Sequence, residues 1–188
     1  MMIRFFILLS LLVSAVSAQA QHEIQIYAPG FQFRYEEGSD QSIDLRGYSH
    51  YSVNYMYQSL LLGIEHNSSQ DNTGSTSLGV KTQMKEWNFL AGFSLAKMEF
   101  QNVTPNTNLE LLIFGVVGQT KAEVETSLNG QSQTDTSDSE QVLGLGGLVL
   151  FRLDYFIVGL DTRYMQSKAY EPNAVSVSTV KLGVNFDY

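Results

Sequence analysis

The chain has 188 residues, of which 44% are hydrophobic and 16% charged, with a formal net charge of −8 and no cysteine. The length suits one domain, since a domain usually takes roughly 100–200 residues, and eleven Lys and Arg argue against nucleic-acid binding. A mean hydropathy near zero excludes a bundle of membrane helices, and the lack of cysteine excludes disulfides, zinc–thiolate sites and thiol nucleophiles.

The first twenty residues have the three parts of a secretory signal peptide. Arg4 gives a positive start, residues 5–13 are almost wholly apolar, and small residues follow up to Ala20. The apolar run is shorter than the about 20 residues that a spanning helix needs. We expect cleavage after Ala20 or Ala18, which leaves residues 21–188 as one exported domain.

Beyond this segment, apolar and polar residues alternate with period two along most of the chain, which predicts strands. In chain order, the expected strands are 31–36, 50–57, 60–65, 87–96, 109–118, 144–153, 156–164 and 180–188. One set of alternate positions holds the large apolar and aromatic residues. The opposite set holds most of the glycines and nearly all the strand charges.

The connections between these strands favour one architecture. Polar stretches are expected at 37–47, 67–83, 122–141 and 168–174, tight links at 58–59 and 153–155, and a longer link at 97–108. Alternating long and short connections are typical of a transmembrane barrel, with the long loops outside and the short turns in the periplasm. We predict an all-β fold, an eight-stranded antiparallel up-and-down transmembrane β-barrel. Alternation by itself also permits a soluble lipocalin-like barrel.

The end of the chain distinguishes the membrane barrel from the soluble one. Its last strand carries Lys181, Gly183, Phe186 and a terminal aromatic, Tyr188. This pattern resembles the C-terminal assembly signal of bacterial outer-membrane barrels. The whole mature chain resembles the small eight-stranded outer-membrane barrel proteins, including the barrel half of OmpA-like proteins, and we expect no peptidoglycan-binding domain. The resemblance implies the outer membrane as location and the barrel-assembly machinery as partner.

The charges of the inner face are balanced. We expect them to form an ion-pair network that fills a narrow lumen, because an unpaired charge there is costly and an eight-stranded barrel is just wide enough for side chains to fill. The predicted members are Arg34, Glu36, Glu65, Glu110, Arg152, Asp161, Arg163 and Lys181. A gated pore, in which a basic side chain swings aside, is the alternative.

Two His-x-Ser pairs raise a catalytic alternative. In strands, residues two apart share a face, so His50 and Ser52, or His66 and Ser68, place an imidazole beside a hydroxyl. The second pair loosely resembles the motif of the outer-membrane lipid A 3-O-deacylases. It falls on the third strand, whereas that family's motif lies near the chain end, and no orienting Glu follows.

We expect a structural or surface-interaction role, through loops rich in Ser, Thr, Asn, Gln and acid, and no catalysis. The alternatives are a lipid A-modifying hydrolase, a small-solute channel and a soluble periplasmic binding barrel. The acidic stretch 134–140 matches no cation-loop spacing, so we predict no metal and no cofactor. The expected surroundings are outer-membrane lipid and lipopolysaccharide, with the protein as a monomer.

Overall fold

The computed structural model describes residues 22–36, 49–74, 78–100, 107–128, 131–170 and 173–187. These ranges form nine antiparallel strands: β1 (His22–Glu36), β2 (Ser49–Tyr57), β3 (Leu60–Gly74), β4 (Leu78–Glu99), β5 (Asn108–Leu128), β6 (Gln131–Thr136), β7 (Glu140–Leu153), β8 (Phe156–Gln166) and β9 (Ala174–Asp187). Within these ranges, no helix combines the length and apolar character that a membrane crossing requires.

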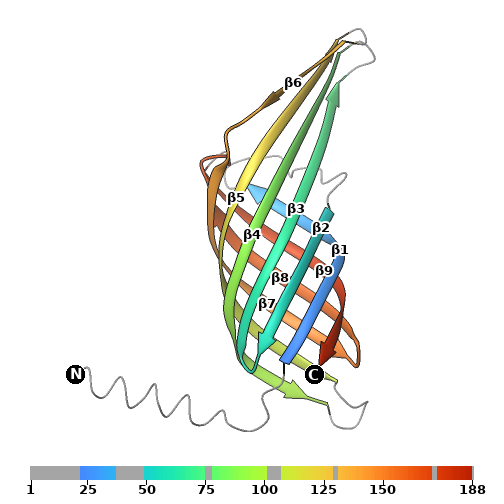
Figure 1. Ribbon diagram of the computed structural model, residues 1–188, viewed down its shortest axis with the longest axis vertical. Coiled ribbons are helices and arrows are strands. Elements are labelled where there is room, and N and C mark those ends of the chain that lie inside the picture. The colour runs from blue at the N-terminus through green and yellow to red at the C-terminus, as the bar shows by residue number, and fades with distance from the viewer. Residues whose placement is uncertain are drawn as a thin grey trace, which may run out of the picture.

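Eight of the strands close into a ring (Figure 1). Each pairs with its neighbours in chain order from β1 to β5 and from β7 to β9, while β5 pairs with β7 and β9 pairs with β1. The ring has no open edge, which is the condition for strands to cross a bilayer. The predicted eight-stranded antiparallel barrel is therefore confirmed.

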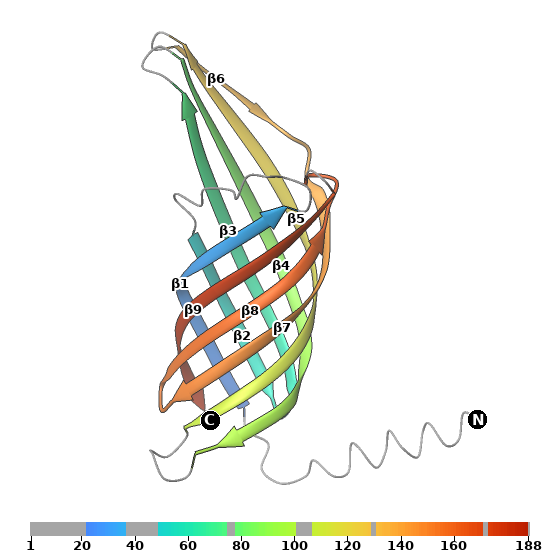
Figure 2. The same cartoon turned by 180° about the vertical axis from the view of Figure 1, so that it is seen from behind.

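The tight turns, the start of β1 and the end of β9 all lie at one end of the barrel (Figure 2). The β2–β3 and β7–β8 turns contain Gln58 and Asp154, whose φ angles of 55° and 56° lie in the left-handed region. At the same end β1 starts and β9 stops, with Glu23 opposite Asp187. Short turns and chain ends mark the periplasmic end of a membrane barrel.

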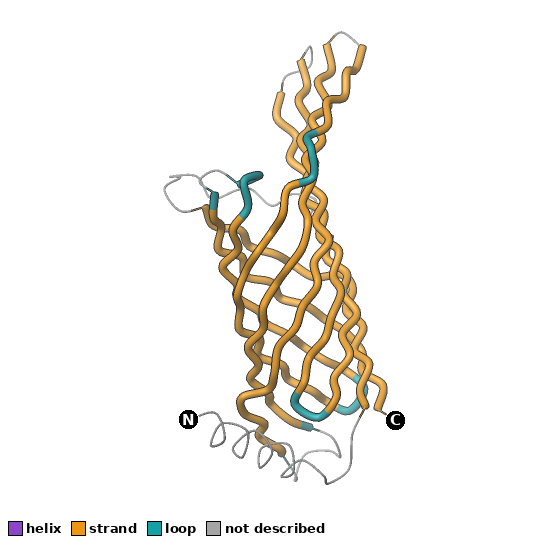
Figure 3. Tube along the Cα trace, turned by 60° about the vertical axis from the view of Figure 1, so that its left-hand side comes forward, coloured by secondary structure: helices purple, strands orange, loops and turns teal. Residues whose placement is uncertain are grey.

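Three strands continue far beyond the other end, where long polar loops are expected (Figures 1 and 3). β3 and β4 stay paired up to Gly74 and Gly79, β4 and β5 up to Leu78 and Leu128, and β6 adds a further antiparallel strand on β5. We call this four-stranded continuation, residues 69–74, 78–85, 121–128 and 131–136, the extension. It protrudes beyond the rim that the other strands form.

The extension corrects two predictions, because residues 67–83 and 122–141 were expected to be loops. Outside the membrane no face of the sheet must be apolar, so these strands lack the alternation on which the prediction depended, and their order comes from backbone pairing together with cross-strand polar contacts. Other boundaries also differ: β9 starts at Ala174, β4 runs to Glu99 and β1 starts at His22.

The early part of β1 was missed because its alternation is interrupted. Residues 22–27 pair with β2 and residues 23–27 also pair with β9, and the β1–β9 register shifts between Tyr27 and Gly30. Pro29 lies within this irregularity. A bulge is one of the few places in a sheet that tolerates a residue without an N–H.

The two faces of the wall divide as predicted. Inward positions of the described strands are buried, whereas large apolar side chains point outward and remain exposed, with Leu145 at 73% and Phe156 at 67%. Exposed aromatics occur toward both ends of the barrel: Tyr51, Trp87 and Tyr164 toward the extension, and Tyr57, Tyr155, Phe156 and Phe186 toward the turns. Exposing such an apolar surface to water is unfavourable in free energy, whereas the hydrocarbon of a bilayer solvates it. The aromatic side chains then lie at the two membrane interfaces.

The described residues leave several predictions outside. They do not include the predicted signal peptide at 1–20 or the expected polar stretch at 37–47. The side chains of Arg34 and Glu36 also lie outside the described part.

Two glycines on neighbouring strands test the packing of the wall. A Cβ added to Gly92 would clash with the Ile113 carbonyl oxygen and lie 2.7 Å from Phe114 Cα, both backbone atoms. At Gly115 the atom nearest to an added Cβ is 3.8 Å away. We expect Gly92→Ala to lower the free energy of unfolding by roughly 1–3 kcal/mol. Gly115→Ala should change it by less than about 0.5 kcal/mol.

Urea unfolding of the refolded barrel in detergent, followed by tryptophan fluorescence, measures both variants. Equal effects at the two positions would show that the contact at Gly92 does not restrict the wall.

Candidate functional site in the barrel lumen

The lumen near the periplasmic end contains one arginine held by several acceptors. Arg152 of β7 donates from Nε to Glu23 Oε1 at 2.9 Å and from Nη1 to Asn108 Oδ1 at 2.9 Å, and it also pairs with Glu110. Gln25 Nε2 donates to the same Glu23 oxygen at 2.7 Å. Two carboxylates and one amide oxygen accept three of the five N–H groups of this guanidinium, which permits its burial.

A second group of charges lies further from the turns. Arg163 of β8 donates from Nε to Asp161 Oδ1 at 3.1 Å and also pairs with Glu65 on the opposite wall, so it bridges β8 and β3 across the lumen. Lys181 of β9 lies 2.7 Å from Asp161 Oδ2. Arg163, Asp161 and Glu65 have fully buried side chains, so these charges are shielded from bulk solvent.

Aromatic rings occupy the space beside the basic groups. The Arg163 guanidinium lies 5.3 Å from the centroid of the Phe114 ring, and Lys181 Nζ lies 5.3 Å from that of Tyr27. The Tyr27 hydroxyl donates to Gln25 Oε1 at 2.7 Å, and Gln25 in turn donates to Glu23, which belongs to the group around Arg152. Tyr27 and Gln25 therefore connect the two groups of charges.

The structure brings six of the eight predicted lumen charges together in two groups, which are Glu65, Glu110, Arg152, Asp161, Arg163 and Lys181. It adds two acids that sequence reasoning missed. Glu23 lies on the overlooked start of β1, where its alternation with Ile24 and Ile26 was the available signal. Glu86 accepts a hydrogen bond from the Tyr170 hydroxyl at 2.9 Å, a contact across 84 residues that no local pattern reveals.

The inner wall formed by β2, β3 and β4 is polar. Cross-strand rows place Ser52, Glu65 and Asn88 side by side, with His50, Asn67 and Glu86 in the next row. The side-chain amides of Asn67 and Asn88 each donate to Glu65 Oε1 at 3.0 Å. The wall therefore supports the carboxylate that receives Arg163.

Several buried atoms of this wall have no hydrogen-bond partner among the described residues, namely His50 Nε2, Ser52 Oγ, Asn88 Oδ1, Glu65 Oε2 and both amide atoms of Asn54. Both donors and acceptors occur in this set. Buried polar groups of mixed character are usually satisfied by water, so this side of the lumen is suited to hold water.

The predicted His-x-Ser pairs do not form a catalytic arrangement. His66 Nδ1 donates to the Glu86 carbonyl oxygen at 3.1 Å, its ring lies 4.5 Å from Trp87, and Ser68 accepts from Gln83 Nε2 at 3.3 Å. His50 donates to Asn67 Oδ1 at 2.7 Å. Among the described residues no hydrogen bond joins either histidine to its serine, so neither hydroxyl has a base beside it.

The C-terminal pattern lies on β9, which closes the ring against β1. Phe186 points outward and is half exposed, Gly183 packs beside Tyr27, and Lys181 points into the lumen. Tyr188 lies outside the described residues. Within the described ranges, no group of three or more His, Cys, Asp or Glu is placed to hold a metal ion.

Comparison with known proteins gives likeness in structure alone. No family model and no curated protein matches the chain. Among solved structures, it resembles Ail, the attachment invasion locus protein of Yersinia pestis, at 16% identity over 91% of this chain and 100% of that chain, with a TM-score of 0.53. It also resembles Neisserial surface protein A, at 12% identity over 90% of this chain and 100% of that chain, with a TM-score of 0.54.

Ail is also known in complex with the heparin analogue sucrose octasulfate, a structure that matches at 14% identity, 90% and 100% coverage and a TM-score of 0.50. At these identities the likeness shows the fold, and the predicted resemblance to small eight-stranded outer-membrane barrels is confirmed. The closed ring, the apolar outer belt and this fold place the protein in the bacterial outer membrane.

The buried ion pairs make a direct stability prediction. Arg163→Ala leaves Glu65 and Asp161 without their guanidinium partner, and breaking such a buried pair typically costs about 3–5 kcal/mol. The matched control is Lys81→Ala, which removes an ion pair with Glu125 whose side chains are each 42% exposed. That pair contributes less than about 1 kcal/mol.

Both variants are compared by the urea midpoint of heat-modifiable migration on gels. Equal midpoints would mean that the lumen charges are already solvated in the folded barrel.

Proposed function

We propose that the protein is an outer-membrane barrel with a closed lumen that presents the extension as a recognition sheet on the cell surface. The supporting observation is the continuation of β3, β4 and β5 beyond the rim together with the added strand β6 (Figure 1). The extension lies at the end opposite the tight turns, which is the outer end of a membrane barrel. In this proposal residues 1–20 direct export, and the last strand is read by the assembly machinery.

The edge of the extension carries the recognition in this proposal. Strand β6 pairs only with β5 among the described strands, and all six of its side chains are exposed. The Ser137 N–H donates to the Ala122 carbonyl oxygen. Successive N–H groups of a strand alternate in direction, so the N–H of Thr134 points away from β5. An exposed edge of this kind can pair with a strand of another protein.

The charges of the extension favour such a partner over a sulfated sugar. Lys85 pairs with Glu123 at 3.0 Å and Lys81 with Glu125 at 3.9 Å, across β4 and β5. The lysines are therefore largely neutralised by neighbouring glutamates. The heparin analogue bound by Ail needs cations to balance its sulfates, and the described part of this extension offers no such cluster.

The first functional test removes the outward N–H of the edge. Thr134→Pro keeps the β5–β6 ladder but blocks pairing at the open edge, and Thr134→Ala is the matched control. One main-chain hydrogen bond contributes about 0.5–1.5 kcal/mol, so we expect a loss of a few-fold to about tenfold in adhesion of proteoliposomes to cultured epithelial cells. Equal adhesion of the two variants would contradict recognition by the edge.

A shortened variant tests the extension as a whole. Gln70 pairs with Gln83, and Glu123 pairs with Thr136, so replacing 71–82 and 124–135 by two-residue turns shortens both hairpins without changing their register. The shortened barrel should still migrate as a folded species on gels. If it also adheres as well as the full protein, recognition lies outside the extension.

The closed lumen is tested by conductance. In planar bilayers we expect the protein to pass no measurable ion current, because Arg163 bridges β8 and β3 and Arg152 bridges β7, β1 and β5. A double variant, Arg152→Ala with Arg163→Ala, should show current steps if it folds. Steps in the unaltered protein would establish the channel instead.

A further inference from the structure

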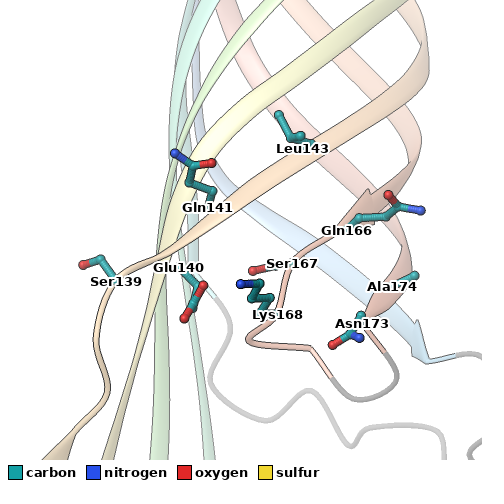
Figure 4. A pocket seen from close by; sticks show the side chains of 9 residues that line it. All are labelled: Ser139, Glu140, Gln141, Leu143, Gln166, Ser167, Lys168, Asn173 and Ala174. Carbon is teal, nitrogen blue, oxygen red and sulfur yellow. The ribbon is translucent and has the colours of Figure 1, made fainter.

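A cavity of about 950 Å³ lies on the outer side of the barrel where β7 and β8 separate. The last paired residues of these strands are Leu143 and Gln166. Beyond them, β7 continues toward Ser139, while β8 turns into the connection to β9 (Figure 4). One wall of the cavity is therefore the start of β7, and the other consists of residues 166–168, 173 and 174 at the end of β8 and the start of β9.

The lining changes from apolar to polar along the barrel axis. Leu143 and Ala174 form an apolar base, and the remaining residues are polar: Ser139, Glu140, Gln141, Gln166, Ser167, Lys168 and Asn173. By area the lining is mainly apolar, and its polar groups are amides and hydroxyls with one base and one acid. Neutral groups that both donate and accept hydrogen bonds suit a polyhydroxylated ligand, and Lys168 supplies a charge for an anionic group.

Lys168 has no competing partner within the described part of the chain. Neither a salt bridge nor a hydrogen bond from its ammonium group is found there, whereas Lys81, Lys85, Lys97 and Lys181 each have an acidic partner. The side chain is exposed beside the cavity. An anion that enters the cavity can therefore reach this exposed ammonium group.

The β8–β9 connection that carries Lys168 is tied to the barrel. The Ser167 N–H donates to the Asn173 carbonyl oxygen at 3.0 Å, and the Ala169 N–H donates to Ser167 Oγ at 3.2 Å. Tyr170, only 1% exposed, donates its hydroxyl to Glu86 inside the lumen. The wall is built before any ligand arrives, which lowers the entropic cost of binding.

The position along β7 fixes the environment of the cavity. Leu145 and Leu143 are the last outward apolar residues of this strand, at 73% and 56% exposed, and Gln141 is the next outward residue. The cavity thus begins where the lipid-facing belt ends, on the extracellular side. A ligand there meets hydrocarbon at its base and water at its top.

We propose that this cavity binds the phosphorylated saccharide headgroup of an outer-leaflet glycolipid. The acyl chains leave the cavity along Leu143 and Leu145. The amides of Gln141, Gln166 and Asn173 hydrogen-bond the sugar, Glu140 accepts from a sugar hydroxyl, and Lys168 pairs with the phosphate. The proposal rests on the outer-membrane location and does not depend on recognition by the edge of β6.

The test uses the full-length mature protein in phosphatidylglycerol nanodiscs doped with bis-phosphorylated lipid A. Native mass spectrometry measures the glycolipid retained, with dephosphorylated lipid A as the second probe. We expect one retained lipid A per protein and weaker retention of the dephosphorylated form. Lys168→Gln should lower the retention of phosphorylated lipid A about tenfold, since a hydrogen bond to a charged group contributes about 1.5–3 kcal/mol.

Two further variants complete the design. Lys97→Gln removes a lysine near the turn end of the barrel, far from the cavity, and should leave retention unchanged, whereas Ala174→Trp fills the base and should abolish it. Heat-modifiable migration checks that each variant is folded. Retention that is insensitive to both Lys168→Gln and Ala174→Trp would overturn the proposal, as would equal retention of phosphatidylglycerol. A loss of epithelial adhesion in Thr134→Pro with lipid retention intact separates this site from the surface function.

Discussion

A strand inside the hydrocarbon core of a bilayer has no water to bond its backbone, so every N–H and C=O must pair with a neighbouring strand. Closing the ring between β1 and β9 and between β4 and β5 satisfies this requirement. The alternation of faces follows from closure, because each residue of a closed wall points either to lipid or to the lumen. The exposed Leu145 and the buried Arg163 are two consequences of the same constraint.

Closure also explains why charges gather inside. The lipid-facing side of the ring excludes them, and the lumen of an eight-stranded barrel is too narrow for bulk water. A charge on the inner face must therefore meet its partner there. Arg152 lies between Glu23 and Glu110, and Arg163 between Glu65 and Asp161. Each arginine joins strands that are distant in sequence, so the ion pairs also fix which walls face each other.

The membrane environment also determines which parts of the structure could be predicted from the sequence. Within the bilayer the environment requires period-two alternation, and so the strand faces, the closed barrel and most lumen charges were predictable from residues such as Asp161 and Lys181. Outside the bilayer that requirement ends. The strands of the extension are polar and pair through their backbones, so no hydrophobic pattern in the sequence predicts them. The bulge after Tyr27 interrupts the alternation, so the start of β1 and the lumen acid Glu23 were not predicted. The contact of Tyr170 with Glu86 depends on the folded ring and has no local signature.

At the outer end of the barrel the lipid-facing wall meets the water-exposed strands, and both proposals concern this end. Above Leu143 the wall no longer has to be apolar, and its strands are no longer forced to pair. β7 and β8 separate and leave a cavity lined by amides and hydroxyls, while β4 and β5 continue and carry β6 outward. A membrane barrel can vary these parts without disturbing its closure. The rim can therefore change while the lumen charges continue to join the walls of the barrel.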